Sequence, residues 1–212
     1  MNIAQLYDKL TSIPLFRGIS GEDLATITER VHLRWINLEP EQFFIREGEQ
    51  CNHIAVLYEG QMWITSRGKD YEVTETIDAQ HIIEPEQLHG LECRYRRTYK
   101  AKTTCKVLLI SKKDIRQTLM HVPVWRINFL NHISLKYTKQ MDREAPTPMS
   151  MKDRIMRFGT SGESQHPQHT LHIRMEDLGN YLGETRRTIS RHLHELASEG
   201  KLTMRPNEIE FK

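Results

Sequence analysis

Two short amphipathic runs around a glycine turn, within residues 171–202, constrain the fold more than any other stretch of this 212-residue chain. The first run carries an apolar helix face at i, i+3, i+4 spacing, made of Leu178, Tyr181 and Leu182. After the turn at Gly183, Thr185 is a candidate N-cap, because its hydroxyl can accept a hydrogen bond from a backbone N–H that has no intrahelical partner. The pattern predicts two helices joined by a short turn, a helix-turn-helix motif.

The second helix is predicted to have an apolar side and a basic side at roughly 100° per residue. The apolar side is made of Ile189, His192, Leu193 and Leu196. The basic side is made of Arg187, Arg191 and His194, flanked by Ser190, with Arg186 in the first turn. Arginines at a helix N-terminus oppose the macrodipole, so the pattern favours a negatively charged partner. Each good Arg–guanine pair is worth about 1–3 kcal/mol of base discrimination. The alternative interpretation is an ordinary solvated helix face.

A strand–turn–strand pattern follows this helix. Strands are expected at residues 202–204 and 208–211, with a turn at Pro206-Asn207 between them. The sequence therefore predicts a two-stranded wing after the helix-turn-helix, with residues 159–170 forming a loop before it.

The stretch DLGNYLGETRRTISRHLHELASEGKL resembles the winged-helix domain of the Crp/Fnr transcription regulators. The resemblance implies that Arg186 and Arg191 read bases or contact phosphates. It also implies positions near the DNA backbone for Thr185, Thr188 and Ser190. Arg187 departs from the family, in which many members have Glu at this position, and we expect a different recognition sequence. All six residues are predicted to bind DNA.

Short apolar, aromatic or β-branched runs occupy residues 33–110. Strands are expected at residues 35–38, 43–45, 54–58, 62–65, 71–77 and 106–110. The phrase FFIREGEQCNHIAVLYEGQMWI resembles the early β-roll of a cyclic-nucleotide-binding domain. The predicted fold is α+β, with an N-terminal double-stranded β-helix (a cupin-like β-roll), a long dimerisation helix and a C-terminal winged helix-turn-helix.

The phosphate-binding cassette of that domain is degenerate in this chain. In HIIEPEQLHGLECRYRRTYKAKTTC, Glu84 matches the acid that binds a ribose hydroxyl in family members, but Ile83 replaces the family's glycine. A Cβ at that position hinders close approach of backbone N–H groups to a phosphate. We therefore expect an effector other than cyclic AMP, in a pocket containing Glu84, Arg96 and Arg97. The basic run at residues 94–102 has two other interpretations, a solvated strand face or a contact with bent DNA or RNA polymerase.

A long helix is predicted to begin at Pro123, since proline is tolerated in the first helical turn. Its near-heptad apolar stripe predicts a dimer interface formed by Leu130, Ile133 (or Ser134), Tyr137 and Met141. Two prolines, Pro146 and Pro148, predict a stiff hinge. The expected division is a β-roll at residues 1–120, a dimerisation helix at 121–144, a linker at 145–150 and a DNA-binding domain at 151–212.

The chain has no recognisable cofactor signature. Its three cysteines, Cys51, Cys93 and Cys105, contain no CxxC pair, and none precedes Cys51, which argues against the iron–sulfur members of the family. We expect buried thiols, with a redox or metal sensor as the alternative. The spacing of His81, His89 and Cys93 fits no structural zinc pattern, and no haem or metal site is predicted.

These observations favour a homodimeric regulator that binds an inverted repeat in double-stranded DNA. The net charge of +2 requires the basic footprint to be local. No catalytic motif is evident, so no enzyme activity is expected. Neither a long apolar run nor a secretory signal is found, which predicts a cytoplasmic protein with no membrane partner. The alternative function is a cyclic-nucleotide-binding module that acts on a protein partner.

Overall fold

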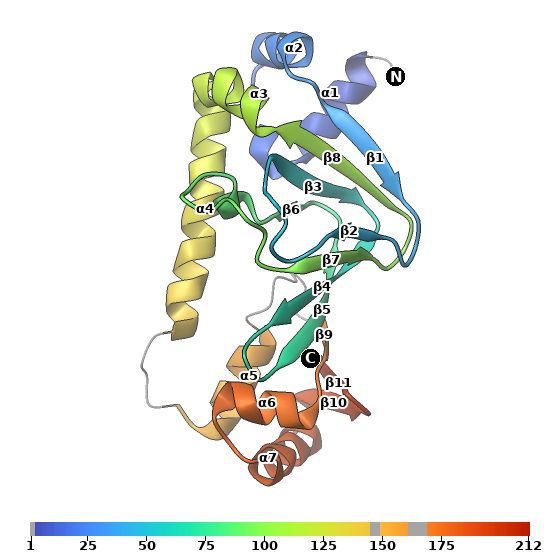
Figure 1. Ribbon diagram of the computed structural model, residues 1–212, viewed down its shortest axis with the longest axis vertical. Coiled ribbons are helices and arrows are strands. Elements are labelled where there is room, and N and C mark those ends of the chain that lie inside the picture. The colour runs from blue at the N-terminus through green and yellow to red at the C-terminus, as the bar shows by residue number, and fades with distance from the viewer. Residues whose placement is uncertain (1–2, 145–148, 161–168) are drawn as a thin grey trace.

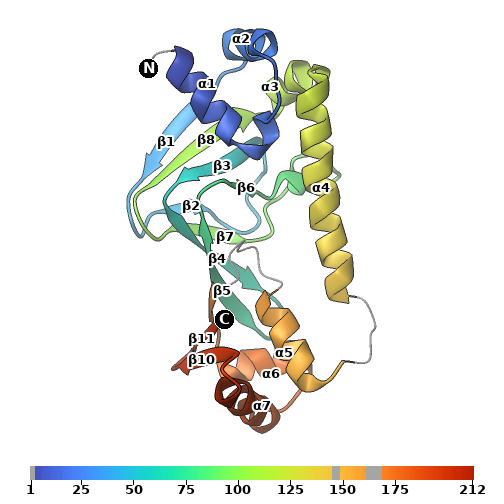
Figure 2. The ribbon, with the colours of Figure 1, turned by 180° about the vertical axis from the view of Figure 1, so that it is seen from behind.

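The structure, a computed structural model, describes residues 3–144, 149–160 and 169–212. The long helix α4 (Pro123–Glu144) lies along one side of an N-terminal β-roll. A smaller domain of helices and strands lies at the end of the roll opposite the N-terminal helices (Figures 1 and 2). This architecture confirms the predicted α+β fold class. The predicted Pro146–Pro148 hinge lies outside the described residues.

Two sheets form the β-roll. The four-stranded sheet has the order β1-β8-β3-β6, and the other sheet contributes β5-β4-β7-β2 to the roll. The strands are β1 (Arg34–Leu38), β2 (Phe43–Ile45), β3 (His53–Glu59), β4 (Gln61–Arg67), β5 (Glu72–Asp78), β6 (His81–Ile83), β7 (Thr98–Ala101) and β8 (Cys105–Ser111). The six strands predicted at residues 35–110 are all present, and β6 and β7 are additional.

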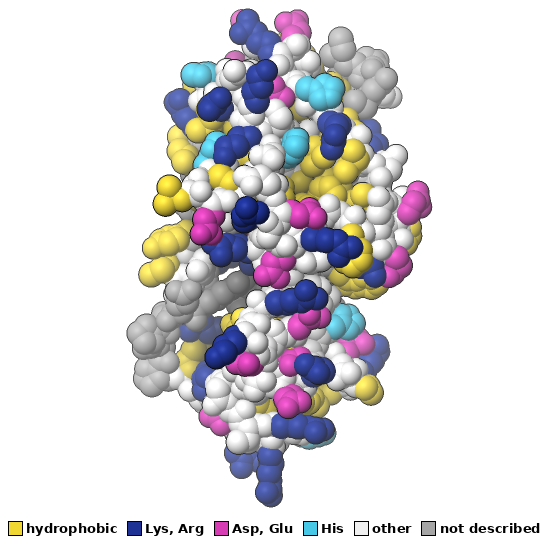
Figure 3. All heavy atoms as spheres, viewed as in Figure 1, with side chains coloured by type: hydrophobic (Ala, Val, Ile, Leu, Met, Phe, Trp, Pro, Cys, Tyr) yellow, Lys and Arg dark blue, Asp and Glu magenta, His cyan; other side chains and the backbone are white. Residues whose placement is uncertain are grey.

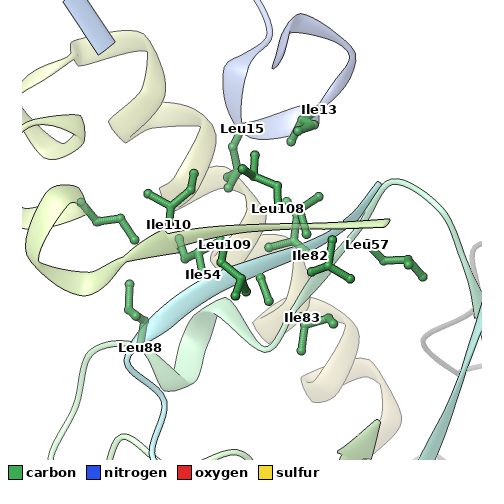
Figure 4. Packing of buried hydrophobic residues seen from close by; sticks show 14 of the residues in the cluster. Ile13, Leu15, Ile54, Leu57, Ile82, Ile83, Leu88, Leu108, Leu109 and Ile110 are labelled. Atoms are coloured by element: carbon green, nitrogen blue, oxygen red, sulfur yellow. The ribbon is translucent and has the colours of Figure 1, made fainter. Parts of the chain in front are cut away.

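The core of the roll follows from alternation along its strands. In β4, Met62 and Ile64 point inward and are fully buried, whereas Trp63 and Thr65 are only half-buried. Strand β3 is buried on both faces at residues 54–57, because the N-terminal helices cover its outer side. Figure 4 shows the resulting packing, in which Ile54, Leu108 and Ile110 of the sheet lie near Leu15 from the N-terminal segment.

Helices cover one end of the roll (Figures 1 and 2). They are α1 (Ile3–Ser12), η1 (Pro14–Phe16), α2 (Gly21–Arg30), α3 (Lys112–Gln117) and η3 (Leu119–His121), whereas η2 (Pro85–Gln87) lies beside α4, where Glu86 pairs with Lys136. Ser20 and Ser111 are the N-caps of α2 and α3 and accept from the backbone N–H groups of Asp23 and Asp114. Helix α4 then buries Trp125 and Phe129 against the roll, with stacked rings 5.2 Å apart.

The C-terminal domain has its own core and a larger sheet than the sequence predicts. It contains α5 (Met151–Thr160), β9 (His169–His172), α6 (Met175–Leu182), α7 (Arg186–Ser198), β10 (Leu202–Arg205) and β11 (Glu208–Phe211). Strand β9 pairs with β11, so the wing has three strands rather than two. The expected loop at residues 159–170 is also wrong at both ends, because α5 continues to Thr160 and β9 begins at His169.

One sheet runs through both domains. On its other side β9 pairs with β5 of the roll, with Thr74 opposite His172 and Glu75 opposite Leu171, which completes the order β10-β11-β9-β5-β4-β7-β2. Side chains reinforce this junction. The Asn180 amide donates to the Asp70 carbonyl at 2.7 Å, and the rings of Tyr71 and Tyr181 meet edge to face with centroids 5.0 Å apart. No local pattern in the sequence indicates this connection.

Candidate nucleic-acid interface and effector site

The turn between α6 and α7 depends on two glycines. Gly183 ends α6 with φ +69°, a left-handed conformation that favours glycine. Gly179 lies against the turn, where its carbonyl accepts from the Glu184 N–H at 2.9 Å. A Cβ on Gly179 would lie 2.7 Å from the Glu184 carbonyl oxygen, closer than a real contact permits. The two helices are therefore held together at close backbone range.

Thr185 is the N-cap of α7, as predicted. Its Oγ1 accepts from the Thr188 N–H at 3.2 Å and lies 3.0 Å from the Thr188 hydroxyl. Ile189, Leu193 and Leu196 are fully buried against the domain core. This burial fixes the rotation of α7, and it confirms the apolar side that the helical spacing predicts.

The opposite side of α7 is basic and open. Arg186, Arg187 and Arg191 are exposed, while Thr188 and Ser190 are half-buried beside them. Within the described part of the chain, none of these three guanidinium groups forms an ion pair with a carboxylate. Lys and Arg side chains project from the end of the molecule where α7 lies (Figure 3). The arrangement leaves three adjacent cations available to an anionic partner.

Ion pairs hold the far half of α7 against α5. Lys152 Nζ lies 2.9 Å from a Glu195 oxygen and 2.7 Å from a Glu199 oxygen. Hydrogen bonds from Lys152 and Lys201 lower the pKa of Glu199 to about 2. Arg154 of α5 also donates to the Leu182 carbonyl at the end of α6. These contacts use the acidic side chains at the C-terminal end of α7, away from the arginines.

In the β-roll, the Glu84 carboxylate is buried and already bound by the protein. Its Oε2 accepts from the Arg96 N–H at 2.7 Å, and its Oε1 accepts from the Tyr99 hydroxyl at 2.9 Å. Burial raises the pKa of Glu84, against the opposing effects of the Arg96 N–H and the Arg97 charge. A ribose hydroxyl would have to compete with these two internal donors.

The two arginines of the predicted effector pocket differ in environment. The Arg96 side chain is exposed and pairs with Glu92 at 3.5 Å, so it is the Arg96 backbone that contacts Glu84. Arg97 is half-buried, and its charge acts on Glu84. Both arginines line a cavity of about 280 Å³ at the domain junction. Its other walls are Ser66, Arg67, Tyr71, Val73 and Glu75 of the roll and Phe158, Leu171 and Tyr181 of the C-terminal domain.

The outward face of α4 is apolar. Ile127, Leu130, Tyr137 and Met141 are each about half exposed, at 53%, 48%, 63% and 49%. With the exposed Ser134 they follow a 3-4-3-4 spacing, whereas Ile133 packs against the core of its own roll. The outward stripe therefore passes through Ser134, the alternative that the sequence left open, and not through Ile133. Yellow side chains mark this edge of the molecule in Figure 3.

The three cysteines are buried free thiols. Among the described residues, no group of three or more His, Cys, Asp or Glu side chains is placed to bind a metal ion. None of the described helices is long and apolar enough to cross a bilayer.

Comparison with known proteins identifies two domains. Residues 35–121 match the family described as cyclic nucleotide-binding domain, and residues 152–212 match the Crp-like helix-turn-helix domain. No curated protein matches the chain in sequence.

Similar folds occur in solved structures. A protein from Eubacterium rectale, described as a transcriptional regulator of the Crp/Fnr family, aligns with TM-score 0.59 and 17% identity over 94% of this chain and 93% of its own. The c-di-GMP responsive global regulator CLP from Xanthomonas campestris aligns with TM-score 0.57 and 15% identity over 91% and 99%. The sensor domain of the regulator DNR from Pseudomonas aeruginosa aligns with TM-score 0.55 and 18% identity over 70% and 98%.

Proposed function

Because this chain joins a cyclic nucleotide-binding domain to a Crp-like helix-turn-helix domain, the architecture of the Crp/Fnr DNA-binding transcription regulators, we propose that it acts as a cytoplasmic homodimer on an inverted-repeat DNA site. In this proposal residues 1–120 sense, 121–144 dimerise, 145–150 form a hinge and 151–212 bind DNA. No catalytic step is part of it.

The open basic side of α7 carries the proposal. Arg186, Arg187 and Arg191 are exposed without carboxylate partners in the described part of the chain. They lie in the first half of a helix whose opposite side is buried, which is the half that reaches base edges and phosphates in the major groove. Thr185, Thr188 and Ser190 lie beside them, within reach of the DNA backbone. Arg187 stands where many family members have Glu, a hydrogen-bond acceptor. Its guanidinium instead donates two hydrogen bonds, so guanine is its preferred base.

Dimerisation is supported by the α4 stripe of Ile127, Leu130, Ser134, Tyr137 and Met141. Four of these side chains are apolar and about half exposed, at heptad spacing. A second helix that covers them would remove this apolar surface from water, which favours association. Pairing of two α4 helices would give two copies of α7, and a dimer of this class binds half-sites about 34 Å apart. The DNA site is therefore an inverted repeat. RNA polymerase is a further partner in this scheme.

The effector in this proposal is not cyclic AMP. Both Glu84 oxygens are bound by groups of the chain itself, and Ile83 and Pro85 flank Glu84. CLP is described as responsive to c-di-GMP, which makes that dinucleotide and cyclic AMP the first two ligands for calorimetry. Binding of cyclic AMP without any DNA preference would instead support the module that acts on a protein partner.

The test is selection of genomic fragments by the full chain, followed by binding at several salt concentrations. We expect an inverted-repeat motif and a linear fall of log K with log salt concentration. Arg186→Ala and Arg191→Ala should each reduce specific affinity, by about 1–3 kcal/mol per lost base contact. Lys100→Ala is the control, because Lys100 lies in the roll and pairs with Glu41. A salt slope near zero, or no preference over random DNA, would refute the proposal.

A further inference from the structure

Two of the three cysteines face each other across a short backbone bridge. Gln50 and Arg94 pair as an isolated antiparallel bridge, and the next residue of one segment, Cys51, donates its N–H to the Cys93 carbonyl at 2.7 Å. Residues that exchange both backbone hydrogen bonds of an antiparallel pair have Cα atoms about 5.5 Å apart, and Cys51 and Cys93 form one of these two bonds. Disulfides span Cα separations of roughly 4.4–6.8 Å. The backbones of Cys51 and Cys93 are thus in direct hydrogen-bond contact, the kind of neighbourhood that a disulfide can span.

In the reduced protein each thiol donates to nearby backbone carbonyls, Cys51 to His53 at 3.6 Å and Cys93 to Leu88 and Gly90 at 3.4 and 3.3 Å, and a disulfide would replace these weak bonds. Burial is the largest cause of the raised pKa of Cys51, and Cys93 adds a little to the rise. Cys93 is 9% exposed, next to the exposed residues 90–92, whereas Cys51 is fully buried. Lys112 Nζ donates to the Cys93 sulfur at 3.1 Å. A cation at this distance stabilises the negative charge of an attacking sulfur.

We propose that Cys51 and Cys93 are a peroxide-oxidised thiol pair that forms a reversible disulfide in the β-roll. The Cys93 thiol gives up its proton, its sulfur attacks one oxygen of hydrogen peroxide and the O–O bond breaks. The departing hydroxide takes up that proton, so one sulfenic acid and one water result. The Cys51 sulfur then attacks the Cys93 sulfur and displaces the oxygen as a second water. In sum, two thiols and one peroxide give one disulfide and two waters, and a dithiol reductant reverses the reaction.

The bond would act on the segment that touches the dimerisation helix. Residues 85–93 contact α4 through the Lys136–Glu86 ion pair at 3.3 Å and through the rings of His89 and Phe129, 6.3 Å apart. Cys93 ends this segment with φ +39°, a left-handed conformation that is strained for a non-glycine residue. Closing the disulfide removes the Lys112 contact and fixes this end of the segment. Because this segment contacts α4, we expect the disulfide to change the affinity of the dimer for DNA. This expected effect on DNA affinity rests on the proposed function.

The chemistry is tested on the reduced full-length protein without DNA. After brief treatment with hydrogen peroxide, free thiols are alkylated and the digest is analysed by mass spectrometry. We expect a peptide pair linked through Cys51 and Cys93, lost on treatment with dithiothreitol, and an alkylated Cys105. Cys105→Ser is the matched control, because its buried thiol donates to the backbone carbonyls of Gln61 and Thr103, and it should leave the linked pair intact.

The variants separate the outcomes. Cys51→Ser should stop at a Cys93 sulfenic acid that dimedone traps. The proposed disulfide would be refuted if both Cys51 and Cys93 were alkylated in peroxide-treated wild type, or if either were linked to Cys105 instead. Wild-type DNA affinity should change on oxidation by about 5–150-fold, and that of Cys51→Ser should not. A linked pair with unchanged DNA affinity would overturn the coupling alone, whereas reduced protein that binds no DNA would overturn the proposed function and leave the disulfide standing.

Discussion

At Thr185 a single hydroxyl closes the first turn of α7, because it accepts from the Thr188 N–H. Thr185→Ala should lower the free energy of unfolding by about 1 kcal/mol, the usual cost of an N-cap residue. Thr185→Ser keeps the acceptor and should restore most of this loss. Urea unfolding followed by circular dichroism measures both variants, and an equal loss in both would contradict the assignment.

Glu84 should make stability depend on pH. Burial raises its pKa above 4.5, so the folded protein holds this proton more tightly than the unfolded chain does. Its contribution to stability is therefore present below the unfolded pKa and is lost as the pH rises through the folded pKa. The free energy of unfolding of wild type relative to Glu84→Gln should fall as the pH rises from about 4.5. Urea titrations across this range test the sign, and a difference that does not change with pH would contradict it.

Sequence periodicity predicted individual residues well where burial is decided locally. The helical spacing that places Ile189 and Leu193 on the buried side also places Arg187 and Arg191 on the exposed side, because the rotation per residue fixes both sides of a helix. The position of Cys93 opposite Cys51 was beyond prediction, because it depends on two segments 42 residues apart. No local pattern encodes such a pairing.

Among the elements, the α6–turn–α7 unit is sensitive at Gly179. Gly179→Ala places a methyl group 2.7 Å from a backbone oxygen, and overpacking of this kind costs about 1–3 kcal/mol. We expect a lower unfolding midpoint in urea and weaker DNA binding. Gly21→Ala, at the first residue of α2 with open space around it, is the control. Equal stability of the two variants would show that the turn can move to accommodate the added methyl group.

Helix α4 should lose its partner when the stripe is charged. Tyr137→Glu places a carboxylate on a side chain that is 63% exposed in the single chain, and we expect dissociation to monomers in sedimentation equilibrium. Lys139→Glu, an exposed position off the stripe, should remain dimeric. A dimeric Tyr137→Glu protein would place the interface elsewhere.

Strand β9 shows why one element escaped prediction. Its sequence, His-Thr-Leu-His, offers one apolar residue and no run of alternation. Pairing with β11 on one side and β5 on the other stabilises it, and both partners are distant in sequence. The longer elements α4, α6 and α7 carry their own periodicity, and each of them was predicted as a helix.

At the scale of the whole molecule, the junction between the domains depends on a few side chains beside the β5–β9 pairing. Tyr71→Ala and Asn180→Ala together remove the ring contact with Tyr181 and the bond to the Asp70 carbonyl. We expect faster amide hydrogen exchange in β9, because its pairing to β5 is then less protected. Tyr58→Ala, which loses an equivalent ring contact with Trp35 inside the roll, should leave β9 unchanged. Unaltered β9 exchange in the double variant would mean that backbone pairing alone holds the junction.

The sheet shared by the two domains also affects how the protein can be divided. Cutting the chain between α4 and α5 would separate β5 from β9 and leave each half with a strand edge whose N–H and C=O groups have lost their partners. Such edges are templates for association with other chains. Either half produced alone is thus prone to form mixed aggregates, and Val73, which is buried in the C-terminal core, would become solvent-accessible in the N-terminal half.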